Sequence, residues 1–140
     1  MYILDTNVLS ELMRPAPKPS VLQWIDNQAA QHLFSSAITK AEIELGIALL
    51  PAGKRRDDLA SQAEAMFNED FENRCLPFDQ DCAHIYANLV AVRTRLGLPV
   101  SVEDAQIAAI CVVNQKTLVT RNTADFVQID GLQVLNPWDA

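Results

Sequence analysis

The chain has 140 residues, of which 49% are hydrophobic and 21% are charged, and its formal net charge is -7. We expect one globular domain spanning residues 1–140, because a chain of this size and composition can bury a core and is not disordered. The acidic charge argues against a broadly basic nucleic-acid surface, so contact with a polyanion would need a metal cation.

The amino-terminal segment changes from apolar to polar at Asp5. Residues 2–4 have strand-like propensity, and apolar residues then recur at helical spacing through residue 12. Asp5, Thr6 and Asn7 therefore mark the junction between a buried strand and a helix. The carboxyl end of a strand is where open α/β sheets bind ligands.

The rest of the chain alternates between helical and strand patterns. Further helices are predicted at residues 20–28, 39–50, 54–71, 79–97 and 101–115, with Ser20 as an N-cap and Gly97 as a C-cap. Short strands are predicted at residues 32–36, 75–78, 117–120 and 132–135. This alternation indicates an α/β fold in which helices cover both faces of a mainly parallel sheet.

Cysteine usage and hydropathy indicate a reduced, cytoplasmic protein. Cys75, Cys82 and Cys111 are odd in number and form no Cys-x-x-Cys pair. The first residues lack the basic start and the long apolar stretch of a signal peptide. The longest apolar run, residues 107–113, is far short of the roughly 20 residues that a membrane span needs, so we expect no membrane contact.

Basic residues are gathered at three places in the chain: Arg14, Lys18, Lys54, Arg55, Arg56, Arg93 and Arg95. We interpret most of them as solvated surface residues, although any of them could contact a phosphate backbone. Trp24 and Trp138 are interpreted as packing residues rather than as platforms for stacked bases.

Glu42 is an unusual residue of the helix predicted at residues 39–50. A helical wheel places it close to Leu45 and Leu49, whereas Glu44 falls on the polar side. Glu42 is therefore a candidate for a functional carboxylate on an apolar face. The alternative is an exposed glutamate at the margin of that face.

Three aspartates are further candidates, and each has a structural alternative. Asp5 could cap the first helix, and Asp104 could form a capping box with Ser101. Asp104 nevertheless falls on the apolar face of its helix. Asp125 follows the strand predicted at residues 117–120, where it could reach the same sheet edge or simply form a turn.

The four acids together indicate a metal site. If they converge to about 5 Å, each pair repels by roughly 3 kcal/mol at an effective dielectric constant near 20. Six such pairs would exceed the roughly 5 to 15 kcal/mol that stabilises a whole domain, so the acids must take up protons or hold a cation. Ligands that are all oxygen suit Mg²⁺ or Mn²⁺ rather than zinc, and His32 and His84 lack metal-ligand spacing.

Four motifs in this order resemble a known family: ILDTNVLSEL near the start, ITKAEIELG at residues 38–46, SVEDAQIAAI at 101–110 and LVTRNTADF at 118–126. The chain resembles the PIN-domain ribonucleases, in particular the VapC-type toxins of prokaryotic toxin–antitoxin pairs. The resemblance spans nearly the whole chain.

The resemblance implies a three-layer α/β/α fold, Mg²⁺- or Mn²⁺-dependent cleavage of RNA, homodimers, and inhibition by a small antitoxin. It matches Asp5 and Asp104 to the two metal-binding aspartates of the family. It matches Glu42 to the helix glutamate, and Asp125 to a more variable fourth acid. A tRNA target is common in the family, but no residue here selects one.

Polar neighbours of these acids match supporting positions of the family. Thr6 and Asn7 match the polar residues beside the first aspartate, which in the family help to orient it, and Thr120 and Asn122 precede the fourth acid. Glu103, next to Asp104, is the alternative metal ligand. We prefer Asp104 because of the helical face on which it lies.

In the expected reaction, Asp5 and Asp104 bind the metal that activates a water for in-line attack on the phosphodiester. Glu42 and Asp125 bind a second metal or orient the water. One rival is a haloacid-dehalogenase-type phosphatase, but its second acid is replaced here by Asn7. The other rival is a catalytically silent module whose acidic pocket grips a basic partner.

Overall fold

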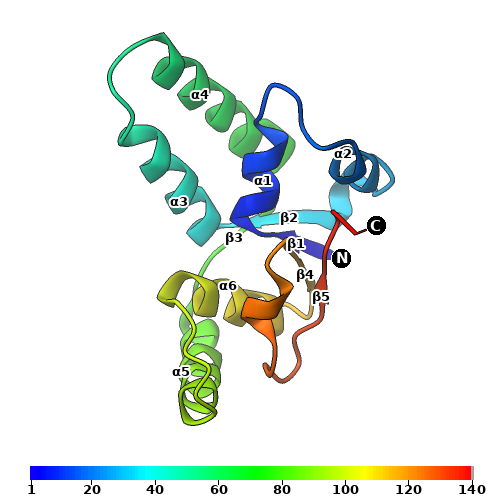
Figure 1. Ribbon diagram of the computed structural model, residues 1–140, viewed down its shortest axis with the longest axis vertical. Coiled ribbons are helices and arrows are strands. Elements are labelled where there is room, and N and C mark those ends of the chain that lie inside the picture. Colours follow the sequence, from blue (N-terminus) through cyan, green and yellow to red (C-terminus); the bar gives the residue numbers. More distant parts are fainter. Residues whose placement is uncertain (140) are drawn as a thin grey trace.

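Five parallel strands form the central sheet of this computed structural model, which describes residues 1–139 (Figure 1). The strands lie in the order β3-β2-β1-β4-β5, and all four neighbouring pairs are parallel. Their bounds are β1 Tyr2–Leu4, β2 Leu33–Ser36, β3 Cys75–Leu76, β4 Thr117–Val119 and β5 Val134–Leu135. The predicted strands are thus confirmed, and no end differs from the prediction by more than two residues.

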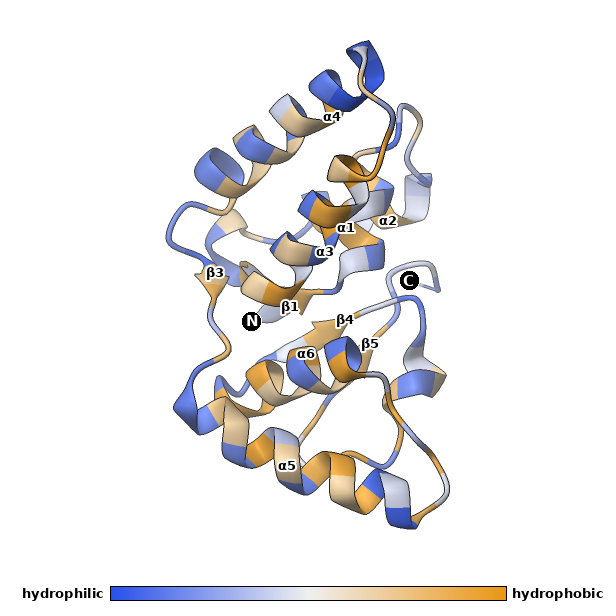
Figure 2. Cartoon of the chain, turned by 90° about the vertical axis from the view of Figure 1, so that its left-hand side faces the viewer, coloured by the Kyte–Doolittle hydropathy of each residue, from blue (hydrophilic) through white to orange (hydrophobic). Residues whose placement is uncertain are grey.

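Helices cover both faces of the sheet. The α-helices within residues 1–139 are α1 Thr6–Leu12, α2 Pro19–Asp26, α3 Ala37–Ala48, α4 Lys54–Ala65, α5 Gln80–Arg95 and α6 Val102–Val113. The shorter helical turns are η1 Ala30–His32, η2 Met66–Asp70 and η3 Thr123–Phe126. Helices α1 to α4 lie on one side of the sheet, and α5 and α6 lie on the other (Figures 1 and 2). The three-layer α/β/α architecture is confirmed.

Successive strand residues supply the two apolar cores, because side chains along a strand point alternately to opposite faces. Ile3 and Leu118 pack with α5 and α6, whereas Leu4 and Val119 pack with α1 to α4. All four side chains are fully buried. These two central strands are therefore held from both sides, and their ends are rigid supports for a site.

The chain reverses its direction of travel across the sheet between β1 and β4. It moves from β1 outward to β2 and β3, and then returns through α5 and α6 to β4 on the other side of β1. In open α/β sheets the crevice for ligands forms at such a switch point, outside the carboxyl ends of the strands. Asp5 stands at this point, where its backbone N–H donates to the carbonyl of Val119 at 2.9 Å.

Two predicted helix starts are wrong. Ser20 does not cap α2, which begins at Pro19; its hydroxyl has no hydrogen-bond partner. Proline occupies the first helical turn readily because its missing N–H is not needed there. Helix α3 begins at Ala37, two residues earlier than predicted, because Ser36 is the N-cap and accepts a hydrogen bond from Thr39 N–H at 3.1 Å.

The segment predicted as one helix at residues 54–71 divides into α4 and the π-helical turn η2. The C-cap of α5 is Leu96, one residue before the prediction, but the left-handed conformation predicted for Gly97 is confirmed by its φ of +73°. Cys75, Cys82 and Cys111 are free thiols. Across residues 1–139, no helix combines the length and the apolar character that a membrane span requires.

Most of the basic residues are exposed, as predicted, and Arg93 is the exception. Its side chain is only 4% exposed, and its guanidinium donates to backbone carbonyls that the tertiary structure brings to it. Arg95, two residues later, is exposed as expected.

Candidate functional site

Asp5 is held rigidly at the carboxyl end of β1. It is the N-cap of α1, and its Oδ1 accepts a hydrogen bond from Thr6 N–H at 2.8 Å. The other carboxylate oxygen, Oδ2, accepts from the Thr120 hydroxyl at 2.8 Å. The capping alternative for Asp5 is thus confirmed, and a second contact from β4's end orients the same carboxylate.

Asn7 and Thr120 join the first and last motifs across the switch point. Asn7 Nδ2 donates to Thr120 Oγ1 at 3.1 Å and to Asp5 Oδ2 at 3.4 Å. Asn7 Oδ1 accepts from Arg121 N–H at 3.2 Å, and Thr120 Oγ1 accepts from Asn122 N–H at 3.1 Å. The four predicted supporting positions therefore lie beside Asp5, with Asn122 contributing through its backbone.

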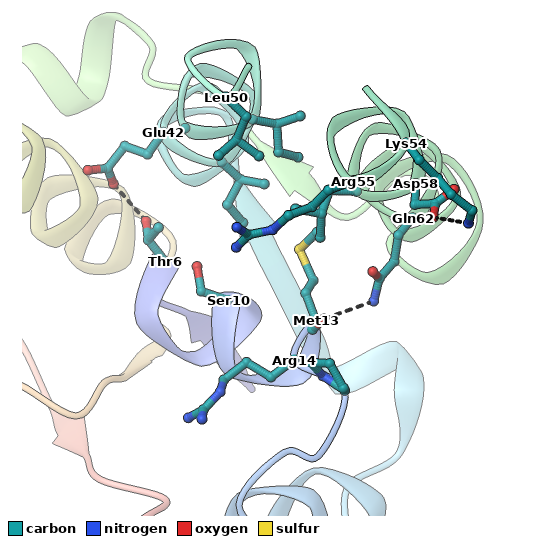
Figure 3. Close-up of a pocket in the computed structure, with 15 residues that line it drawn as sticks. Thr6, Ser10, Met13, Arg14, Glu42, Leu50, Lys54, Arg55, Asp58 and Gln62 are labelled. Carbon is teal, nitrogen blue, oxygen red and sulfur yellow. Dashed lines mark hydrogen bonds and ion pairs between the residues drawn. The ribbon is translucent and has the colours of Figure 1, made fainter. Parts of the chain in front are cut away.

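Glu42, in α3, lies close to Asp5 because it contacts Thr6, the next residue in the chain. The Thr6 hydroxyl donates to Glu42 Oε1 at 2.6 Å, and it lies 3.0 Å from the hydroxyl of Thr39 (Figure 3). Thr39 is fully buried and was not among the predicted site residues. Its position three residues before Glu42, on the same helix face, is the signal that could have found it.

The helical-wheel reason for selecting Glu42 is wrong, although Glu42 does accept a hydrogen bond from Thr6, beside Asp5. Leu45 and Leu49 are 59% and 75% exposed, so their face of α3 is not covered. The buried residues of α3 are Thr39 and Ile43. Apolar periodicity located an apolar stripe, but a neighbouring element decides whether such a stripe is buried.

Asp104 lies in α6 and Asp125 lies in η3, and the charge of Asp125 acts on Asp104. Ser101 caps α6, because its Oγ accepts from Asp104 N–H at 3.2 Å. This cap uses the backbone of Asp104, whose carboxylate is half-buried, whereas Glu103 is exposed. Asp125 lies in η3, where its N–H donates to Asn122 O at 3.0 Å, so the turn alternative is confirmed. This hydrogen bond uses only the backbone of Asp125, and its side chain is exposed.

Burial and mutual repulsion act on two of these carboxylates. Burial raises the pKa of Asp5 to about 6, hydrogen bonds from Thr120 and Thr6 act in the opposite direction, and the charges of Asp104 and Glu42 raise it further. Burial also raises the pKa of Asp104; the Ser101 contact lowers it, and the charges of Asp125, Glu42 and Glu103 add to the rise. Asp5, Glu42, Asp104 and Asp125, here called the acid cluster, therefore share one electrostatic environment.

The donor set of the acid cluster fits a hard divalent cation. Within residues 1–139, no three Asp, Glu, His or Cys side chains are placed closely enough to ligate the same metal ion. The cluster nevertheless offers only oxygen donors, as Mg²⁺ and Mn²⁺ prefer. In the same part of the chain, no Lys or Arg forms a salt bridge with any of its members, so its negative charge is not neutralised by the protein.

The sequence matches the PIN domain family over residues 2–132, which include all four acids. The chain belongs to the PIN-domain family. Asp5, Glu42, Asp104 and Asp125 therefore form the candidate site of a PIN domain.

Relatives of this PIN domain match it from end to end. The plasmid stability protein StbB of Pseudomonas syringae is 48% identical over 140 residues, which is 100% of both chains. The VapC ribonuclease Y4jK of Sinorhizobium fredii is 41% identical, and the toxin FitB of Neisseria gonorrhoeae is 39% identical, each over 99% of both chains.

Solved structures agree with the fold of this PIN domain. The crystal structure of FitAcB from Neisseria gonorrhoeae superposes with a TM-score of 0.93, at 38% identity and over 100% of both chains. A toxin-antitoxin complex from Klebsiella pneumoniae superposes with a TM-score of 0.70, at 25% identity and over 98% of both chains.

Proposed function

We propose that this PIN domain is a metal-dependent endoribonuclease and the toxin of a toxin–antitoxin pair. One observation carries the proposal: the buried Asp5 carboxylate stands at the β1–β4 switch point, where the charges of Glu42 and Asp104 act on it. Within residues 1–139 no basic side chain forms a salt bridge with it. Such a site repels the phosphates of RNA unless a cation lies between them. The names of the VapC ribonuclease and the FitB toxin support the same conclusion.

Asp5 and Asp104 are the proposed ligands of Mg²⁺ or Mn²⁺. The bound cation would neutralise phosphate oxygens and lower the pKa of an attacking water. The Thr6 N–H and the Thr120 hydroxyl donate to Asp5 and fix the orientation of its carboxylate. Glu42, held by the Thr6 hydroxyl, and Asp125 would orient the water or hold a second ion.

Cleavage of RNA by the purified chain tests the proposal. We expect discrete fragments from a labelled pool of total RNA with Mg²⁺ or Mn²⁺, and none with EDTA or with Asp5→Asn under any condition. The physical reason is that Asn at this position keeps the shape of the side chain but removes the negative charge that attracts the cation. A folded, partner-free chain that cuts nothing would favour the silent binding module instead, and full activity of Asp5→Asn would reject the site.

A groove beside the acid cluster is the proposed docking site of the antitoxin. It has a volume of about 920 Å³ and lies between α1, α3 and α4, with Thr6 and Glu42 among its lining residues. Figure 3 shows this pair at one end of the groove and Arg55 pointing into it. Most of its lining is apolar, through Met13, Ile43, Ile47, Leu50 and Leu59. An amphipathic segment could fill it and present a basic side chain to Glu42.

Gly46 allows this docking site to be blocked without disturbing the fold. It lines the groove, and a Cβ at this position would meet nothing within 4 Å. We expect Gly46→Leu to weaken inhibition of cleavage by the proposed antitoxin by about 10-fold or more, because the added side chain occupies space that the antitoxin would fill. Ala41→Leu, on the exposed side of α3, is the matched control. Equal inhibition of both variants would place the antitoxin elsewhere.

We also propose that the chain forms a homodimer through the outward face of α3. Leu45 and Leu49 are the two most exposed large apolar side chains of that helix, and neither lines the groove. We expect the 15.5 kDa chain to sediment as a dimer and the pair Leu45→Lys with Leu49→Lys to sediment as a monomer. Leu22→Lys, on exposed α2, should leave the dimer intact. A dimer that persists in the α3 variant would reject this face.

A further inference from the structure

Arg93 is a buried cation that no acidic side chain pairs with in the described part of the chain. It lies in the last turn of α5. Its Nε donates to the carbonyl of Leu98 at 2.7 Å, and its Nη1 donates to the carbonyls of Asp125 and Val127 at 2.9 and 2.8 Å. The three acceptors belong to two segments that are far apart in the sequence.

A guanidinium in this position is stabilised only if both segments keep their places. Removing the charge from water is costly unless hydrogen bonds replace its hydration. The carboxyl end of α5 helps, because its partial negative charge favours a cation in the last turn. The turn at Gly97 completes the arrangement, since Leu98 N–H donates back to the carbonyl of Arg93 at 2.9 Å. The planar, rigid fork of arginine then fixes one segment relative to the other.

Both segments carry members of the acid cluster. Leu98 lies three residues before Ser101, the N-cap of the helix that bears Asp104. Asp125 is itself an acceptor, and the bond goes to its backbone carbonyl while its side chain stays exposed. The two carboxylates interact, since the charge of Asp125 acts on Asp104. Arg93 therefore binds the backbone of the segments that carry or lead to both acids, and it forms no hydrogen bond with either carboxylate.

We propose that Arg93 is a positioning residue of the acid cluster, which ties the segment of Asp125 to the turn that leads into the helix of Asp104. This inference rests on the proposed function, because it gives both acids a role at the cation. A residue that merely stabilises the fold would change only the fraction of chain that is folded, not the Mn²⁺ affinity of the folded chain. A positioning residue acts on cation binding and turnover, and it does so through Asp125.

A double-mutant cycle separates these roles. Four forms are compared: the unmodified chain, Arg93→Lys, Asp125→Asn, and the double variant. Mn²⁺ affinity is measured by calorimetry without RNA, and kcat and KM are measured with RNA. Arg93→Lys keeps the positive charge but removes the planar guanidinium that donates to both segments. We expect it to weaken Mn²⁺ binding and to lower kcat by about 10-fold each, as for other residues that orient metal ligands, with little change in KM.

In the Asp125→Asn background, we expect Arg93→Lys to change Mn²⁺ affinity and kcat by less than about twofold, because the carboxylate through which it acts is gone. Equal losses in both backgrounds, or no loss in either, would overturn the proposal. Arg95→Lys, which changes an exposed arginine of the same helical turn, is the control and should match the unmodified chain. Arg93→Gln, which keeps a planar amide donor, replaces the lysine variant in the cycle if the latter does not fold.

The proposed function is tested separately by Asp5→Asn in the same assays. Loss of cleavage in Asp5→Asn together with normal cleavage in Arg93→Lys would overturn only the role of Arg93. Full cleavage by Asp5→Asn would overturn the proposed site, whatever the result of the cycle.

Discussion

We expect Asp104→Asn to lower the rate of RNA cleavage by about 1000-fold, which corresponds to a loss of about 4 kcal/mol of transition-state stabilisation. The neighbouring Glu103→Gln should leave the rate within about threefold of the unmodified chain. The difference arises from their surroundings. Asp104 is half-buried and shares the electrostatic environment of Asp5, Glu42 and Asp125, whereas Glu103 is exposed.

These two substitutions are a matched pair. Both remove one negative charge from the first turn of α6, so both lose the same favourable interaction with the helix dipole. Single-turnover cleavage at saturating Mn²⁺, with unfolding followed in urea, separates a loss of chemistry from a loss of stability. A large loss in Glu103→Gln and none in Asp104→Asn would reverse the assignment of the metal ligand.

We expect the Asp5 carboxylate to make the metal-free chain less stable as the pH rises. Its pKa is raised from 3.8 to about 6 in the folded chain, so between these values the folded state binds more protons than the unfolded state. The free energy of unfolding therefore falls as the pH rises through this window, by about 3 kcal/mol in total. The stabilisation is fully present below pH 4 and is lost above about pH 6.

Asp5→Asn should remove this dependence. Urea unfolding in EDTA at constant ionic strength, from pH 4 to pH 8, should show the variant more stable than the unmodified chain above pH 6. Asp26→Asn, exposed at the end of α2, is the control and should follow the unmodified chain. Adding Mn²⁺ at pH 7 should reverse the order, because a ligand that binds only the folded, unmodified site stabilises it by mass action. Parallel curves for the unmodified chain and Asp5→Asn would contradict the raised pKa.

The architecture could be predicted because it depends on local pattern. Strand and helix periods alternate along the chain, and parallel strands with helical connections form a sheet that is covered on both faces. Asp5 at the end of β1 and Gly97 at the end of α5 follow from the same reasoning, since each marks a change of backbone conformation that the neighbouring residues already show.

The surroundings of individual side chains could not be predicted in this way. The exposure of Leu45 and Leu49, and the bond from Thr6 to Glu42, depend on how α3 packs against elements that are distant in sequence.

The clearest case is Arg93, a basic residue of the kind expected on the surface. It is buried, and its guanidinium donates to the carbonyls of Leu98, Asp125 and Val127. Local propensity and periodicity specify which elements form and in what order they occur. The bonds from Arg93 to Asp125 and Val127, and from Thr6 to Glu42, join residues more than thirty positions apart, so only the packed chain decides that they form.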